Sequence, residues 1–365
     1  MKKVIIIFLL IILFSVPVKA DDLYKETVEN SNISEINEFL PDEIKEFFKK
    51  ENIEITDANW NKHLTAKNVF SHIFSFFRSG GKAPFRCLAV LLSIIILSGA
   101  VEAFSGSDKG LSEPLGFIFS VIVCLSIADG VISVINASVA AIKGTGTFML
   151  SFVPIYSGII LLSGSPTTAT VSGGMLILAA EIIVQAAAFI IVPLMCAYFG
   201  LGLASGISPL IRDNSIVTAV KNIALWVLAL TFTAFAGLLS LQTTLNTTAD
   251  TVGVKTAKFF VASFVPVAGP ALSEALTTVS ASMQLLKSSV GLYAVIAVIL
   301  ILLPLIIELF LWRIVIIITG SVSNMLSIKL TGVLKAMDSL IAVLMGMILF
   351  VGALFTISIS VLIKK

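Results

Sequence analysis

The chain has 365 residues, of which 57% are hydrophobic and only 13% are charged, and its mean hydropathy is +1.05. A soluble globular protein is about 45–50% apolar and about 25% charged, so this composition excludes a soluble enzyme and indicates an integral membrane protein. The formal charge of +2 is unevenly distributed, because residues 21–60 contain twelve Asp and Glu against four Lys, whereas residues 61–365 contain ten acidic and seventeen basic residues.

Residues 1–20 have the pattern of a secretory signal peptide. Two lysines precede an apolar run at 4–14, and the tripeptide at 18–20 suits a cleavage site. The apolar run is well short of the roughly 20 residues that a spanning helix needs, which favours a cleaved peptide over an uncleaved anchor. Both interpretations predict that the chain from Asp21 onward is exported.

Residues 21–82 are predicted to form a small, acidic and mostly helical extracytoplasmic domain. Pro41 and the acidic residues after it open a predicted helix in which Ile44, Phe47 and Phe48 recur at helical spacing. Because the segment has few apolar residues, we expect it to become ordered against the membrane domain or a partner.

Residues 83–365 are predicted to form a multi-spanning membrane domain of about six to eight helices. Apolar stretches long enough to cross a hydrocarbon core of about 30 Å lie at 87–104, 115–139, 174–203, 219–243, 289–320 and 334–362. Two further stretches, 146–163 and 259–286, are interrupted by prolines, and we expect re-entrant, interfacial or kinked segments there, shielded by protein. The predicted fold class is all-α, a polytopic helical bundle.

The two interrupted stretches also indicate an internal repeat. Ser151, Phe152, Val153 and Pro154 recur, 112 residues later, as Ser263, Phe264, Val265 and Pro266. Downstream, the sequence Val-Pro-Leu at 192–194 is echoed by Leu-Pro-Leu at 303–305. We therefore predict a duplication that relates residues 143–205 to residues 255–316. Copies with two crossings each would be parallel, and copies with three would be inverted.

Polar side chains within the apolar stretches are the candidates for function, because unpaired charge in hydrocarbon costs several kcal/mol and normally faces a cavity or a partner. These candidates are Asp129, Glu181, Gln185, Glu308 and Arg313. Glu181 and Gln185 are four residues apart and share a helix face. Glu308 and Arg313 are five residues apart, so each is expected to pair with another helix. The alternative is that these residues are structural contacts of the bundle, or lie close enough to a membrane interface for their charged ends to reach it.

Nothing in the sequence predicts catalysis, a cofactor or a metal site. Neither an HExxH nor a GxSxG motif is present, and both histidines, His63 and His72, precede the membrane domain. Cys87, Cys124 and Cys196 show no CxxC spacing and are interpreted as small buried hydrophobic residues.

Three stretches around the second copy carry a family resemblance. The sequences KTAKF at 255–259, SFVPVAG at 263–269 and LLKSSVG at 285–291 resemble the stage III sporulation protein AE family of endospore-forming bacteria. The similarity extends over nearly the whole chain, including the signal peptide, the acidic segment and the doubled Phe-Val-Pro element.

This resemblance implies a subunit of the channel or secretion-like complex that joins mother cell and forespore during engulfment and is needed for late forespore gene expression. It implies a place in the mother cell membrane that surrounds the forespore. The implied partners are other proteins of the stage III complex, including an ATPase and ring-forming subunits, and a forespore membrane protein. The family's implied contribution is part of the conduit. No nucleic acid is expected as a partner.

A second hypothesis is an autonomous ion-coupled transporter. It is suggested by the repeat and by the intramembrane carboxylates of Glu181 and Glu308, because many transporters build a central pathway from repeated, interrupted segments.

Overall fold

The computed structural model describes residues 32–55, 57, 60, 65–105, 109–207, 215–264, 269–326 and 331–363. Within these ranges the protein is helical and contains no strand, which confirms the all-α prediction. The elements are η1 (Asn32–Phe39), α3 (Asp42–Lys50), α4 (Ala66–Gly80), α5 (Lys82–Ser105), α6 (Lys109–Leu162), α7 (Pro166–Ala186), η3 (Ala187–Ile191), α8 (Val192–Ile207), α9 (Ser215–Phe264), α10 (Gly269–Met325) and α11 (Thr331–Ile363). The predicted signal peptide lies outside the described residues.

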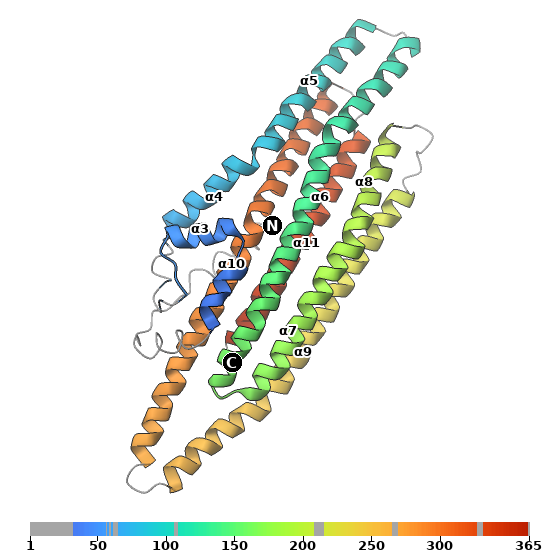
Figure 1. Cartoon of the computed structure of the whole chain (residues 1–365). Coiled ribbons are helices and arrows are strands. Elements are labelled where there is room, and N and C mark those ends of the chain that lie inside the picture. The colour runs from blue at the N-terminus through green and yellow to red at the C-terminus, as the bar shows by residue number, and fades with distance from the viewer. Residues whose placement is uncertain are drawn as a thin grey trace.

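The long helices form an elongated up-and-down bundle in which α5, α6, the continuous α7–α8 rod, α9, α10 and α11 alternate in direction (Figure 1). Six segments of the described chain are long and apolar enough to cross a membrane: Lys82–Val101, Pro114–Leu162, Pro166–Ser205, Ser215–Leu238, Met283–Met325 and Gly332–Ile363. They coincide with the six stretches predicted from hydropathy, and the protein is a polytopic membrane bundle.

Several of these apolar segments are much longer than a bilayer requires. Pro114–Leu162 has 49 residues and Met283–Met325 has 43, which correspond to about 73 Å and about 65 Å at a rise of 1.5 Å per residue. The hydrocarbon core is about 30 Å thick. Each of these helices therefore extends well beyond a single hydrocarbon layer.

Of the alternatives expected for the first proline-containing stretch, 146–163, the structure has a helix that continues through the proline and not a re-entrant or interfacial segment. Helix α6 runs through Pro154 to Leu162, and a turn at 163–165 leads into α7. Pro154 lies on the exposed side of α6, whereas Phe152 and Tyr156 are buried and stack on one another at 5.1 Å between ring centroids. Packing on the buried face holds the helix together where proline removes one backbone hydrogen bond.

The second copy of the motif lies at a helix end. Ser263 and Phe264 are the last residues of α9, while Val265 and Pro266 lie outside the described residues, and α10 begins at Gly269. Helices α6 and α9 run in the same direction along the bundle, and α7 and α10, which follow them in the chain, run in the opposite direction (Figure 1). The equivalence of the two copies stays a prediction.

Helix α7 continues into α8 through η3, a single π-turn that precedes Pro193. Helix α7 packs against α6 and α9, while α8 packs against α11 and α9.

The three cysteines differ in exposure. Cys196, on α8, is exposed, whereas Cys87 on α5 and Cys124 on α6 are buried. The prediction of buried cysteines is therefore wrong for Cys196, whose thiol lies on an outward-facing side of α8.

The N-terminal segment lies beside the bundle, with η1 against α6 and α3 against α10 (Figure 1). Most apolar side chains of η1, α3 and the residues that follow α3 are buried, and Trp60 is only 1% exposed. The indole N–H of Trp60 donates a hydrogen bond to Ser289 Oγ at 2.9 Å, and the Tyr293 hydroxyl donates one to Asn37 Oδ1. The rings of Trp60 and Tyr293 meet edge to face at 5.6 Å. The segment thus packs against the membrane domain through these contacts with α10.

His72 joins α3 to α4. Its ring stacks on Phe47 at 4.1 Å and meets Phe76 edge-on at 4.4 Å. Nε2 of His72 is buried and has no hydrogen-bond partner among the described residues. Burial lowers the pKa of His72 below its ordinary value, and the positive charge of Lys50 lowers it further.

Candidate functional site

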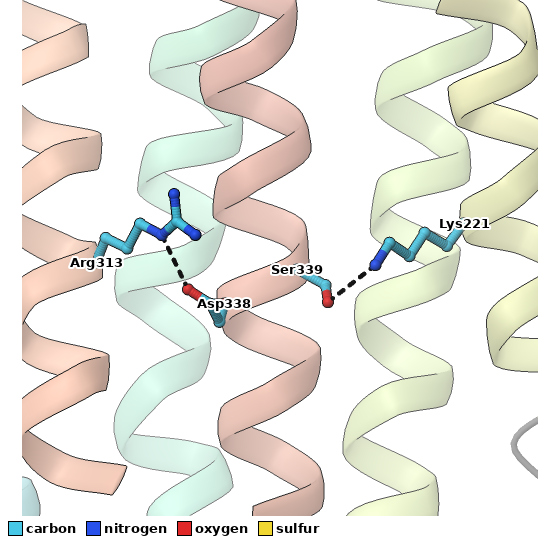
Figure 2. A network of polar contacts seen from close by, with 4 residues as sticks. All are labelled: Lys221, Arg313, Asp338 and Ser339. Atoms are coloured by element: carbon cyan, nitrogen blue, oxygen red, sulfur yellow. Dashed lines mark hydrogen bonds and ion pairs between the residues drawn. The ribbon is translucent and has the colours of Figure 1, made fainter. Parts of the chain in front are cut away.

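Three charged side chains and one serine, from three neighbouring helices, form a layer that crosses the bundle, which we call the polar layer. It consists of Lys221 on α9, Arg313 on α10, and Asp338 with Ser339 on α11 (Figure 2). All four residues lie within the apolar segments that could cross a membrane. Lys221 and Asp338 are six and seven residues from the starts of their helices, about 9–11 Å along the helix axis.

An ion pair joins α10 to α11. Nε of Arg313 donates a hydrogen bond to Oδ1 of Asp338 at 3.1 Å, and the two side chains are 29% and 41% exposed. The prediction that Arg313 pairs with another helix is thus confirmed. Pairing keeps both charges tolerable in an apolar layer, where either alone is costly.

A second polar contact joins α11 to α9. Nζ of Lys221 donates a hydrogen bond to Oγ of Ser339 at 3.2 Å. Asp338 and Ser339 are adjacent on α11 and therefore differ by about 100° around the helix axis, which directs Asp338 toward α10 and Ser339 toward α9 (Figure 2). Helix α11 is therefore held between two cations at the same depth.

Two small grooves flank this helix. One, of about 290 Å³, lies between α9 and α11 and is lined by Lys221 and Ser339 together with apolar residues. The other, of about 240 Å³, lies between α10 and α11 and is lined by Ser321, Asn324 and Lys335. Asp338 lines both grooves. A change in the pairing of Asp338 would therefore alter both at once.

The charges of the polar layer do not cancel. Lys221 and Arg313 carry two positive charges, Asp338 carries one negative charge, and Lys335 adds a cation at the second groove. Such a layer can attract an anion, exchange the partner of its carboxylate, or fix the register of three helices.

The other carboxylates singled out from the sequence lie apart from this layer. Asp129 is exposed on α6. Glu181 and Gln185 do share one face of α7, since Nε2 of Gln185 donates a hydrogen bond to Oε1 of Glu181 at 2.6 Å, but both side chains are exposed on the outside of the bundle.

Glu308 is half-buried on α10, opposite α4. A Cβ atom placed on Gly80 would lie 3.8 Å from Cβ of Glu308. One turn later comes Trp312, whose ring is buried against Gly130 of α6. A Cβ atom at Gly130 would lie 2.6 Å from Cζ2 of that ring. Glu308 thus belongs to the α4–α10 contact rather than to the polar layer.

Sequence reasoning missed Lys221, Asp338 and Ser339. Lys221 and Asp338 stand near the starts of the predicted stretches 219–243 and 334–362, where charges normally reach headgroups. The helices begin earlier than hydropathy indicates, so these charges lie deeper. The available signal was the opposite sign of Asp338 and Arg313 on neighbouring stretches.

Comparisons with known proteins agree on one family. A family model described as "Stage III sporulation protein AE" matches residues 44–365. The "Stage III sporulation protein AE" of Bacillus subtilis (strain 168) is 24% identical over 239 residues. The matched region spans 66% of this chain and 59% of that relative's length. No solved structure matches the chain.

Proposed function

The chain belongs to the stage III sporulation protein AE family, whose model covers residues 44–365, and on that premise we propose that it is an integral membrane subunit of the channel complex linking mother cell and forespore. Its role is in sporulation. In this proposal the complex sustains late forespore gene expression, and this chain supplies part of the conduit.

The polar layer is the observation that carries the conduit part of the proposal. A charged side chain at the centre of a membrane-spanning helix costs about 2.5–3.5 kcal/mol on insertion scales. The free energy of inserting this bundle is therefore less favourable with Lys221, Arg313 and Asp338 than it would be with apolar residues at the same positions. The position of Lys221 and Asp338 in the lining of the grooves beside α11 supports a pathway for polar solutes along that helix.

The proposal includes partners and a location. The partners are the other stage III proteins, among them an ATPase and ring-forming subunits, and a forespore membrane protein. The chain has no phosphate-binding motif, so ATP hydrolysis is assigned to a partner and no catalysis to this subunit. The membrane is that of the mother cell around the forespore. With six crossings, the N-terminal segment and the end of α11 face the same, extracytoplasmic side.

A complementation experiment tests the role of the polar layer. In a strain lacking the native gene, D338N removes the charge that pairs with Arg313 but keeps the side-chain volume and an oxygen that can still accept the hydrogen bond of Arg313, which an alanine at this position would not. We expect late forespore reporter expression to fall while protein level and co-purification of partners stay normal. The matched control is D42N, because Asp42 is 96% exposed on α3. Full reporter expression from D338N would remove Asp338 from the pathway, and loss of the protein from the membrane would assign it to folding instead.

The same strains test the carboxylates predicted from sequence. E181Q and E308Q nearly preserve volume and remove charge. A pathway role for either residue requires reduced reporter expression at normal protein level, as for D338N.

The autonomous transporter remains the second candidate, favoured by a charged layer built within one chain. Purified protein in liposomes separates the two hypotheses. Ion-coupled uptake by this chain alone would support the transporter, whereas solute passage that requires the partner proteins would support the channel subunit.

A further inference from the structure

Helix α4 has three distinct faces, and one of them is already occupied. Ile73 and Phe76 pack against Leu303, Ile307 and Leu311 of α10. This contact fixes α4 beside the bundle and determines which of its other side chains point outward. In Figure 1 α4 leaves the lower end of α5 along a flatter path than the bundle axis.

The second face is an exposed row of phenylalanines. Phe70, Phe74 and Phe77 are 70%, 67% and 36% exposed, and Phe85 continues the row onto α5 at 51%. The spacing of four and three residues places Phe70, Phe74 and Phe77 on one side of the helix. An apolar row of this kind on a polar helix needs a cover.

The third face is basic. Arg78, Lys82 and Arg86 follow one another at intervals of four residues and are exposed, which aligns them in a stripe next to the phenylalanine row. Exposed serines at 71, 75 and 79 complete this face. Among the described residues no ion pair joins this stripe to a carboxylate.

Helix α4 is joined to a membrane-crossing segment without a linker. The backbone N–H of Gly81 donates to the Phe77 carbonyl at 3.0 Å, and the N–H of Phe85 donates to the Gly81 carbonyl at 3.0 Å. Hydrogen bonding therefore continues from α4 into the apolar span Lys82–Val101. Wherever α5 enters the bilayer, α4 must begin at that surface.

We propose that α4 is an interfacial helix that binds a lipid monolayer containing anionic phospholipids. Phe70, Phe74 and Phe77 enter the acyl region, while Arg78, Lys82 and Arg86 contact headgroup phosphates. An amphipathic helix with aromatic residues on one face and Lys or Arg on the other has this binding mode. In the topology proposed above, Arg78, Lys82 and Arg86 lie at the extracytoplasmic surface. Basic residues are usually found on the cytoplasmic side, and binding to anionic headgroups explains why these three are not.

Lipid is favoured over a protein partner by two observations. The covalent continuity of α4 with a spanning helix brings its phenylalanine row to the membrane surface before any partner binds. The unpaired basic stripe beside that row matches the order of phosphate and acyl layers in a monolayer. A protein partner is therefore an outcome of the test rather than the proposal.

The test compares neighbouring positions on different faces of α4. The whole chain carries F74C or S75C in a background in which Cys87, Cys124 and Cys196 are replaced by Ala, and a nitroxide label is attached in lipid nanodiscs. Collision with oxygen reports acyl chains, and collision with a water-soluble nickel complex reports water. We expect the label at 74 to favour oxygen several-fold more than the label at 75. Thermal unfolding of the wild-type and Cys-free proteins checks that the cysteine replacements leave the fold intact. In proteins that keep the native cysteines, quenching of the tryptophan fluorescence of F74W and S75W by brominated lipids repeats the comparison of the two positions.

The composition of the nanodisc tests the basic stripe. Insertion at position 74 should be deeper with phosphatidylglycerol present than with phosphatidylcholine alone, and the combined changes R78Q, K82Q and R86Q should abolish that difference. Water accessibility at both positions would overturn the proposal in favour of a protein-binding face. Burial of both positions in hydrocarbon would make α4 part of a span and overturn it equally, and depth independent of anionic lipid would overturn the headgroup contact.

Discussion

Trp60 is expected to hold the N-terminal segment on the membrane domain. Its side chain is buried and contacts α10 through Ser289 and Tyr293. Replacing it with alanine removes a large buried ring, whereas replacing it with phenylalanine keeps most of the ring but removes the indole N–H. The two substitutions therefore separate packing from hydrogen bonding at this contact.

The expected magnitudes differ several-fold. Truncation of a buried Trp to Ala costs about 3–5 kcal/mol. Loss of a single hydrogen bond costs about 1 kcal/mol, and a smaller ring adds to this loss. We take exchange of the α3 amides to require undocking of the N-terminal segment. W60A should then raise the equilibrium constant for undocking by at least about 150-fold, and W60F should raise it by at least about fivefold.

Hydrogen exchange measured by mass spectrometry on the whole protein in nanodiscs checks these values, with α3 (Asp42–Lys50) as the reporter and α11 as an internal reference. The control is W226A, because Trp226 is 72% exposed on α9 and far from the docked segment in sequence. We expect W226A to leave exchange in α3 unchanged. Wild-type exchange in α3 of the W60A protein would refute the reasoning, because the segment would then be held by contacts that do not involve Trp60.

Three further predictions concern packing, charge and pH. G130A should lower thermal stability by about 1–3 kcal/mol because its methyl group meets a buried indole ring, while G116A on the same helix, with nothing within 4 Å of its Cβ, should not; equal melting temperatures for the two would contradict this account. R313A or D338A alone should destabilise the protein by about 2.5–3.5 kcal/mol, by leaving one charge unpaired, and the double variant by less than the sum; additive losses in denaturant unfolding would show that the two charges are not coupled. Because burial lowers the pKa of His72, the unfolded state binds more protons near pH 6, so stability should be constant above about pH 7 and fall as the pH drops below about 6.5; H72F should remove this part of the pH dependence in thermal unfolding, and an unchanged profile would assign it to other groups.

Hydropathy was sufficient to place the six spans because it depends only on the summed transfer free energy of about 20 residues. The helix at α3 was predictable for a similar reason, since Pro41 and the first-turn acids are local signals and Ile44, Phe47 and Phe48 follow helical spacing. Both features are encoded by residues close together in the chain.

The features that sequence reasoning missed depend on contacts between distant segments. Whether Pro154 breaks α6 is decided by the packing of Phe152 and Tyr156 on the buried face, which no local pattern records. Asp338 and Ser339 acquire their role only because α11 lies between α9 and α10. The charge of Arg313 predicted that it needs a partner, but the identity of that partner requires the helix arrangement.

The π-turn at Ala187–Ile191 changes the phase of a single long rod. A π-turn holds one residue more than an α-helical turn, and one residue corresponds to a rotation of about 100° around an α-helix. The face of α7 that packs on α6 and the face of α8 that packs on α11 therefore point in different directions around the rod. Deleting one residue within Ala187–Ile191 would leave the rod almost as long but bring its two halves into phase, so that one apolar stripe would have to serve two different neighbours. We therefore expect the bundle to be sensitive to a change of a single residue in the length of this segment, although the segment contains no charged side chain and lies within an apolar stretch.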